Sequence, residues 1–311
     1  MSRYLIVVDG GGTKTEFCIS DIKGNPIKSY FRGTTNYKSV GLEAMSLNLK
    51  LGLNDILSDQ RIKSEDIAYI VFGISGLDSD KDYNKVLKEI QALNISSENF
   101  YLCNDGLLSF YSAADKPGII VVSGTGSIVL GINRLGLINR SGGWGYPFSS
   151  LGSGFYIGNE LLKKTLLYCD GNYPYSKLFQ KVKDYYRIKE FKDLPYRITD
   201  ITNYYEIADA SKIVTDNSNK DEPLAMEILN QAAAYLSLDV KNVYQKFSFE
   251  NEDKINIVFS GGTLEGKLYS DMLEAKIKEE LRADNIKFIK QESSPAKGGI
   301  KFAKKLYEQN K

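Results

Sequence analysis

Histidine is absent from this chain of 311 residues. The chain therefore has no imidazole general base, no Ser-His-Asp or Cys-His catalytic arrangement and no histidine-ligated zinc. Any proton transfer must use a carboxylate, a lysine, a tyrosine, a thiol or water. An aspartate becomes the leading candidate for an enzymatic base.

Cysteine is scarce, and the three that occur, Cys18, Cys103 and Cys169, lack the spacing of metal ligands. An odd, isolated set argues against a disulfide framework. Cys18 and Cys103 lie in apolar runs and are expected to be buried.

Long apolar runs and an excess of one charge are also missing. No run approaches the roughly 20 residues that span a bilayer, and the N-terminus has no apolar core of a signal peptide. The net charge is +1, so no global field favours nucleic acid or a membrane. We expect a cytoplasmic protein whose partner is a small molecule.

A glycine-rich junction near the start is the most informative feature. The apolar run 5–8 ends at the segment DGGGTKT, residues 9–15. Glycines let the backbone approach an anion closely, and N–H groups, hydroxyls and a lysine can hold phosphate oxygens. The candidate phosphate ligands are Gly11, Gly12, Thr13 and Lys14, with Asp9 placed to organise Mg²⁺ directly or through water. A plain hairpin turn is the alternative interpretation.

The pattern recurs in the second half. Residues 120–127 repeat the apolar run and glycine turn, and residues 257–263 are a third variant. Internal repetition predicts two related half-molecules, each offering a turn to a shared ligand, with chance similarity as the alternative. The candidate phosphate contacts here are Gly124, Thr125, Gly126, Gly261, Gly262 and Thr263.

Apolar periodicity predicts an α/β chain. Its length indicates about two domains, and Lys116-Pro117-Gly118 is the predicted boundary. Glycine-rich turns are expected up to Gly145, and no P-loop or dinucleotide motif is present. Strands are predicted at 3–9, 14–20, 26–32, 67–74, 99–103, 118–123, 127–133, 255–260 and 286–290, and helices at 39–57, 80–92, 153–168, 221–246, 265–282 and 295–308, with a helical insertion at about 174–215.

Five motifs together resemble a known superfamily. DGGGTKT, then NDG at 104–106, SGTGS at 123–127, GGWG at 142–145 and SGGT at 260–263 follow the order found in actin-like ATPases. More narrowly, the chain resembles the N-acetylglucosamine kinases and their BadF/BadG-type ATPase relatives. The resemblance implies two ribonuclease-H-like domains around a central cleft, comprising residues 1–116 and 117–294. It also implies that the terminal segment 295–311 packs back on the first domain.

The resemblance further implies an ATP-dependent amino-sugar kinase that uses Mg²⁺ and phosphorylates a 6-hydroxyl, and we expect a homodimer. Asp105 follows an apolar strand and is the candidate general base, with a helix N-cap as the alternative. Two of the candidate sugar contacts below have structural alternatives. Asp78 is alternatively a turn or capping residue, and Trp144 is alternatively a core residue. The candidate sugar contacts are Asn36, Ser75, Gly76, Asp78, Asp105, Thr125, Gly143, Trp144 and Gly145.

One stretch departs from the resembled kinases. Many of them carry Gly-Asp-Glu-Gly-Ser after GGWG, whereas this chain has Ser-Ser-Leu-Gly-Ser at 149–153. Fewer acids near the substrate mean less repulsion of a sugar that carries its own carboxylate. We hypothesise that N-acetylmuramic acid is accepted as well as N-acetylglucosamine.

Other functions remain open at this point. Glucosamine, glucose or another small alcohol is an alternative substrate. A BadF-type activator of a dehydratase would need paired cysteines for an iron–sulfur cluster, and the contexts of Cys103 and Cys169 are unsuited to that. A non-catalytic sugar sensor or an interaction module on the same fold is the third alternative.

Overall fold

The computed structural model describes residues 3–93, 99–145, 149–198, 204–216, 220–291 and 293–310. It divides into two compact units. Unit 1 comprises Met1–Asp115 together with Gln291–Lys311, and unit 2 comprises Lys116–Lys290. Within the described ranges, no helix combines the length and the apolar character needed to cross a membrane.

Unit 1 is built on a five-stranded sheet in the order β3-β2-β1-β4-β5. Neighbours β1 and β2, and β2 and β3, pair antiparallel, whereas β1 and β4, and β4 and β5, pair parallel. The carboxyl ends of the three parallel strands therefore meet at one edge of the sheet. The strands are β1 (Tyr4–Gly10), β2 (Lys14–Asp21), β3 (Pro26–Gly33), β4 (Ile67–Ile74) and β5 (Phe100–Cys103).

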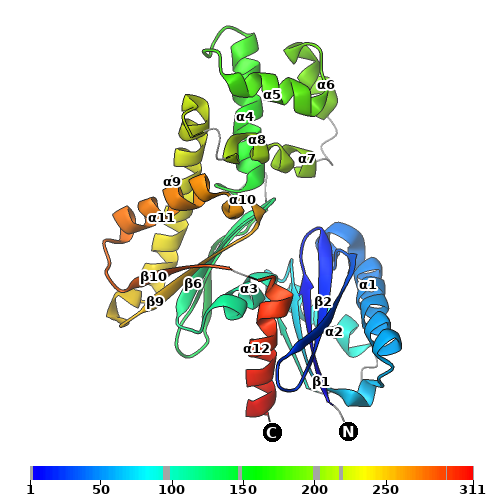
Figure 1. Ribbon diagram of the computed structural model, residues 1–311. Helices are drawn as coiled ribbons and strands as arrows, with labels where there is room; N and C mark the ends of the chain where they lie inside the picture. Colours follow the sequence, from blue (N-terminus) through cyan, green and yellow to red (C-terminus); the bar gives the residue numbers. More distant parts are fainter. Residues whose placement is uncertain are drawn as a thin grey trace. The chain divides into compact units, whose positions relative to one another are not determined.

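Helices cover both faces of this sheet, with α1 and α12 on opposite sides (Figure 1). One face of β1 and β2, including Val8 and Phe17, joins α1 and α2 in a hydrophobic core. On the other face, glycines let α12 approach closely, because a Cβ at Gly299 would lie 2.7 Å from Leu108 Cδ1. The helical elements are α1 (Tyr37–Gln60), η1 (Ser64–Asp66), α2 (Asp80–Gln91), α3 (Asp105–Ala113) and α12 (Pro295–Gln309).

Unit 2 repeats the topology of unit 1. Its five-stranded sheet has the order β10-β9-β6-β7-β8, and read from β8 it is again three antiparallel strands followed by two parallel ones. The two sheets confirm the related half-molecules that the internal repeat predicts. The strands are β6 (Gly118–Ser123), β7 (Ser127–Ile132), β8 (Ile138–Gly142), β9 (Ile255–Ser260) and β10 (Ile286–Lys290).

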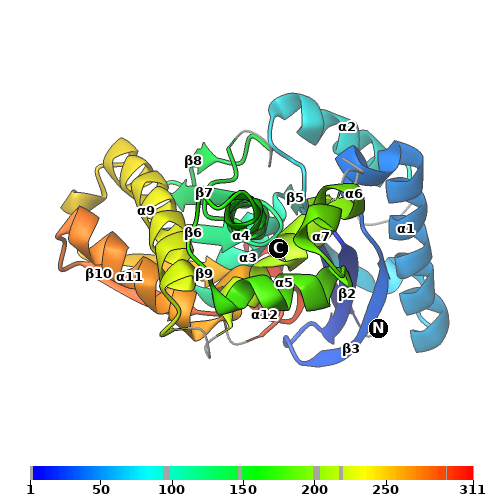
Figure 2. The same ribbon diagram turned by 90° about the horizontal axis from the view of Figure 1, so that it is seen from above.

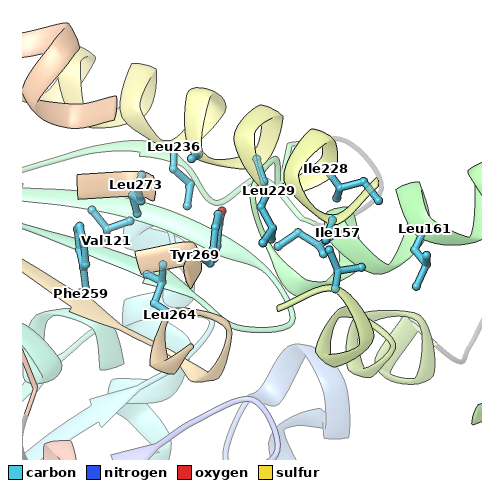
Figure 3. Close-up of a cluster of buried hydrophobic side chains, with 14 of the residues drawn as sticks. Val121, Ile157, Leu161, Ile228, Leu229, Leu236, Phe259, Leu264, Tyr269 and Leu273 are labelled. Carbon is cyan, nitrogen blue, oxygen red and sulfur yellow. The ribbon is translucent and has the colours of Figure 1, made fainter. Parts of the chain in front are cut away.

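The helices of unit 2 form two groups. Helices α9 and α11 lie side by side (Figures 1 and 2), and Leu236 and Leu273 from them pack with Val121 and Phe259 of the sheet (Figure 3). Helices of the predicted insertion gather around α4, with residues 199–203 outside the described part. The elements are α4 (Gly154–Cys169), α5 (Lys177–Tyr186), η2 (Phe191–Asp193), α6 (Leu194–Ile198), α7 (Tyr204–Asp209), α8 (Ser211–Thr215), α9 (Pro223–Lys246), η4 (Phe249–Asn251), α10 (Gly262–Glu265) and α11 (Lys267–Leu281).

One local prediction is wrong. Strand β8 occupies a stretch where glycine-rich turns are predicted, because pairing with β7 supplies an order that the polar sequence INRSG does not signal. The predicted helix 265–282 occurs as α11, and Gly266, with extended backbone angles (φ −63°, ψ 122°), separates it from the short helix α10 before it. The remaining predicted strands and helices occur at about the expected positions.

Candidate active site

Two aspartates lie at the edge of the unit 1 sheet where the parallel strands end. Asp9 is near the end of β1, and Asp105 follows β5 and opens α3. The pKa of Asp9 is raised to about 8, first by burial and then by the negative charges of Asp105 and Glu16, whereas Lys14 lowers it. Burial likewise raises the pKa of Asp105 to about 7, with the backbone N–H of Gly106 opposing the rise. The fold thus concentrates negative charge that a cation would stabilise.

Asn104, rather than Asp105, is the N-cap of α3. Its side-chain Oδ1 accepts a hydrogen bond from the N–H of Gly106 at 2.8 Å, and Asp105 is the first helical residue. Asp105 Oδ1 accepts from the same N–H at 3.0 Å. Since Asn104 already caps the helix, the N-cap role considered for Asp105 does not account for its carboxylate.

Glu16 is a third carboxylate that the sequence reasoning missed. It stands directly opposite Asp9 in the β1–β2 ladder, so both side chains are on the same face. It is buried, and its Oε1 accepts a hydrogen bond from Ser29 Oγ at 2.8 Å. Like charges directly opposite each other destabilise a sheet. An acidic residue at an inward position of an otherwise apolar strand is the sequence signal that could have revealed it.

The donor set suits Mg²⁺ that is shared with a phosphate. Among the described residues, no group of three or more His, Cys, Asp or Glu side chains is placed to hold a metal ion. Mg²⁺ commonly takes one or two carboxylates and completes its shell with water and substrate phosphates. Asp9 supplies one carboxylate for that pattern, and a bound cation would oppose the burial that raises its pKa.

The β1–β2 turn is closed and exposes its polar end. The N–H of Gly11 donates to the carbonyl of Lys14 at 3.0 Å, and the hydroxyl of Thr34 donates to the carbonyl of Gly11 at 2.8 Å. Thr13 and Lys14 are exposed, as an anion-binding role requires. Glycine is needed at the strand end, because a Cβ at Gly10 would lie 2.1 Å from a buried threonine hydroxyl.

Three of the candidate sugar contacts of unit 1 lie together. Asn36 caps α1 by accepting from the N–H of Lys38 at 3.0 Å. A Cβ at Gly76, which has a φ of 87°, would lie 2.7 Å from the side-chain oxygen of Asn36. Ser75 donates its N–H to the carbonyl of Gly10 at 2.8 Å. The hydroxyl of Ser75 is buried and finds no hydrogen-bond partner in the described chain, so it has capacity for a ligand.

Asp78 has a partner within the protein. Its Oδ2 lies 2.6 Å from the ammonium of Lys38, which also lies 3.0 Å from Asp82. The Asp78 side chain is 27% exposed. Asp78 therefore has a structural role, as an ion-pair partner of Lys38, and its side chain is still accessible from solvent.

The glycine turn of unit 2 is assembled from three segments. The carbonyl of Gly124 accepts from the N–H of Gly154 at 2.7 Å and from the hydroxyl of Thr263 at 3.2 Å. Gly261 has a φ of 97°, and a Cβ there would lie 2.4 Å from the carbonyl oxygen of Ser123. The repeat SGTGS, the stretch 151–154 and the motif SGGT thus meet at one place. In the described chain, the N–H groups of Thr125 and Gly126 have no acceptor.

Tyr269 connects this turn to the core of unit 2. It is fully buried (Figure 3), and its hydroxyl donates to the carbonyl of Gly152 at 2.7 Å. The same carbonyl accepts from the hydroxyl of Ser123 at 2.9 Å. A polar atom inside an apolar core needs such a partner, and here the partnership holds the turn in position.

The GGWG motif follows β8 and exposes its tryptophan. Trp144 is 69% exposed, so the core role considered for it is wrong. Its N–H donates to the hydroxyl of Ser149 at 2.9 Å, so this donor is used within the protein. Flanking Gly143 and Gly145 have positive φ angles of 74° and 101°. The guanidinium carbon of Arg140, a residue missed at the sequence level, lies 4.0 Å from the centroid of the Trp144 ring.

Comparisons with known proteins agree with this architecture. The chain is 28% identical to the N-acetyl-D-glucosamine kinase of Dictyostelium discoideum, over 97% of the chain and 98% of that protein. It is 29% identical to the N-acetylmuramic acid/N-acetylglucosamine kinase of Clostridium acetobutylicum, with 97% and 98% covered. A solved structure of a candidate N-acetylglucosamine kinase from Chromobacterium violaceum has the same fold, with a TM-score of 0.76, 23% identity, and 97% and 99% covered.

A family model provides the assignment. The model of the BadF/BadG/BcrA/BcrD ATPase family matches residues 7–303, which include all of unit 2, most of unit 1 and every candidate site residue. The match confirms the resemblance that the five motifs predict. The chain belongs to the BadF/BadG/BcrA/BcrD ATPase family, and it is an ATP-using enzyme with an actin-like fold.

Proposed function

We propose that this chain is an ATP-dependent amino-sugar kinase that phosphorylates N-acetylglucosamine and N-acetylmuramic acid at the 6-hydroxyl. The observation that carries the proposal is the position of Asp105 beside Asp9 at the carboxyl ends of the parallel strands of unit 1. Ligands of open α/β sheets bind at such edges. The names of the two curated relatives support an amino-sugar substrate.

Asp105 would act as the general base. A sugar hydroxyl donates its proton to the carboxylate of Asp105 while its oxygen forms a bond to the γ-phosphorus of ATP. The bond from that phosphorus to the bridging oxygen breaks, and ADP leaves. The raised pKa of Asp105, about 7, matches a base that must accept a proton near neutral pH.

The remaining candidate residues would bind and orient the substrates. Thr13 and Lys14, with the N–H groups of their turn, would hold phosphate oxygens, as would the turn of Thr125 and the SGGT segment of unit 2. Mg²⁺ near Asp9 would neutralise charge on the phosphates. Asn36 and Ser75 would read sugar hydroxyls through hydrogen bonds.

The cysteines argue against the dehydratase-activator alternative. Cys18 and Cys103 are buried and Cys169 is exposed. Burial raises the pKa of the Cys103 thiol far above its ordinary value, whereas a cluster ligand must be a thiolate. Burial of Cys18 and Cys103 leaves one exposed cysteine, where paired cysteine ligands would be needed.

A coupled assay of ADP formation across amino sugars and plain hexoses tests the proposal. We expect turnover with N-acetylglucosamine and N-acetylmuramic acid, dependence on Mg²⁺, and ³¹P NMR of the product showing a phosphomonoester at the 6-position. ADP formation that no sugar stimulates would refute the proposed kinase. Turnover confined to glucose or glucosamine would correct the substrate.

A further inference from the structure

Arg140 is a charged side chain of unit 2 that has no counter-ion among the residues the structure describes. Its Nη1 atom is buried and has no hydrogen-bond partner among the described residues. In that part of the chain, no carboxylate forms an ion pair with it. By contrast, Arg134 in the same hairpin is 60% exposed at its side chain and pairs with Glu252 and Asp253.

The strand places Arg140 next to the GGWG motif. Strand β8 is the outer strand of its sheet (Figure 2), and Arg140 lies opposite Leu130 of β7. Its neighbour Ser141 points to the other face, where its hydroxyl bonds to Asp239 of α9. Arg140 therefore occupies the face away from α9, and its guanidinium lies over the ring of Trp144.

Stacking on Trp144 does not satisfy the guanidinium. A cation over an indole ring gains attraction from the π face, but the N–H groups in the guanidinium plane still require acceptors. The ammonium of Lys246 lies 3.5 Å from the backbone carbonyl of Arg140, which leaves the side chain unaffected. A buried polar group without a partner is costly and calls for a ligand or another explanation.

A carboxylate is the ligand that fits best. The planar fork of an arginine binds a carboxylate through two parallel hydrogen bonds. The stretch 149–153, which holds the N–H of Trp144 through Ser149, contains no acid that could compete for the guanidinium. Trp144 is exposed beside it and offers an apolar surface to a sugar ring.

We propose that Arg140 binds the carboxylate of an acidic amino sugar, such as the lactyl group of N-acetylmuramic acid, and so determines specificity for the charged substrate. This inference rests on the proposed kinase function and deepens it. Arg140 then contributes to the binding of N-acetylmuramic acid and very little to that of N-acetylglucosamine, which has no carboxylate.

The variants Arg140→Gln and Arg140→Lys, each assayed with both sugars, test the inference. We expect Arg140→Gln to raise KM for N-acetylmuramic acid about 10- to 100-fold, as the loss of a charged hydrogen-bonded pair predicts. KM for N-acetylglucosamine should stay within about threefold. Arg140→Lys should lie between wild type and Arg140→Gln, because it keeps the charge without the fork. Arg134→Gln, a matched control from the same hairpin, should leave both constants unchanged.

Isothermal titration of each sugar without ATP separates binding from turnover, and circular dichroism checks that the variants are folded. Equal losses for both sugars, or no loss for either, would overturn the role of Arg140. If the wild type phosphorylates N-acetylglucosamine but neither binds nor phosphorylates N-acetylmuramic acid, the inference fails while the kinase proposal stands. If no sugar is phosphorylated, the kinase proposal fails, and selective loss of N-acetylmuramic acid binding in Arg140→Gln would still support the inference.

Discussion

The two units share one strand topology but carry different chemistry at equivalent positions. In the repeated motif, Asp9 of unit 1 corresponds to Ser123 of unit 2. Asp9 faces Glu16 across the ladder and has a raised pKa. Ser123 is buried, and its hydroxyl donates to the carbonyl of Gly152 at 2.9 Å. The same backbone frame thus concentrates charge in one copy and holds a neutral, hydrogen-bonded turn in the other.

The difference shows that a strand order positions a site without choosing its chemistry. Unit 1 gathers carboxylates that repel each other in the absence of a cation. Such strain is common where a site prepares for a ligand. Unit 2 instead supplies glycines, hydroxyls and backbone N–H groups. These groups do not titrate near neutral pH, so their contribution to stability does not change with pH there.

The largest expected effect is on turnover, and it distinguishes Asp105 from the exposed acids of unit 1. Asp105→Asn should lower kcat by roughly 10²–10⁴-fold, the usual contribution of a positioned base, because an amide accepts no proton. Titration calorimetry should show ATP binding largely kept. Asp115→Asn, which alters an exposed acid of the same unit that pairs with Lys305, is the control and should retain full turnover. A kcat near the wild-type value in Asp105→Asn would remove Asp105 from the role.

A second prediction tests whether unit 2 tolerates an acid at position 123, which corresponds to Asp9 in unit 1. Ser123→Asp would bury a carboxylate at a position where Ser123 now donates to a backbone carbonyl. We expect a loss of roughly 3–5 kcal/mol in the free energy of unfolding, as for an uncompensated buried charge. Urea denaturation followed by circular dichroism measures it, and Ser123→Ala serves as the milder control. Unchanged stability would mean that unit 2 tolerates charge as unit 1 does.

The stability of unit 1 should fall as pH rises. Asp9 and Asp105 have folded pKa values of about 8 and about 7, both above the ordinary 3.8. The folded state therefore holds protons that the unfolded state has released. The contribution of these two groups to stability is greatest below about pH 4, and it is lost as the pH rises through 7 to 8. Thermal unfolding between pH 5 and 8.5 without ligand should show this trend for wild type.

The variant Asp9→Asn tests how much of this pH dependence comes from Asp9. The ligand-free variant should melt at a higher temperature than wild type at pH 8, because a carboxylate facing Glu16 is removed. It should also lose the stabilisation that we expect Mg²⁺ with ATP to give to wild type. A parallel decline of wild type and Asp9→Asn with pH would assign the titration to other groups.

The smallest expected effect concerns the support of the unit 2 turn. Tyr269→Phe removes a hydroxyl that donates to the carbonyl of Gly152, while the hydroxyl of Ser123 still bonds to it. We expect a loss of about 1 kcal/mol, the usual contribution of one hydrogen bond, with kcat nearly unchanged. Denaturation midpoints with wild type as reference measure it, and a tenfold drop in kcat would instead place Tyr269 in control of the turn's function.

Several expectations remain predictions. These include the domain limits 1–116 and 117–294, the terminal segment 295–311, of which residue 311 lies outside the described part, the homodimer, and the roles of the individual site residues. Crystals with a non-hydrolysable ATP analogue and Mg²⁺ would test the phosphate ligands and Asp9 together.

The sequence by itself determined most of the elements and their order. Glycine turns after apolar strands, and their repetition, are local signals, because backbone freedom and strand periodicity depend on neighbouring residues. The tertiary structure alone decided which residues meet: Glu16 lies opposite Asp9, Asn104 caps α3, β7 holds strand β8, and Arg140 lies over the ring of Trp144. Cross-strand pairing and burial join residues far apart in the chain, so charge and pKa at the site emerge only when the sheets form.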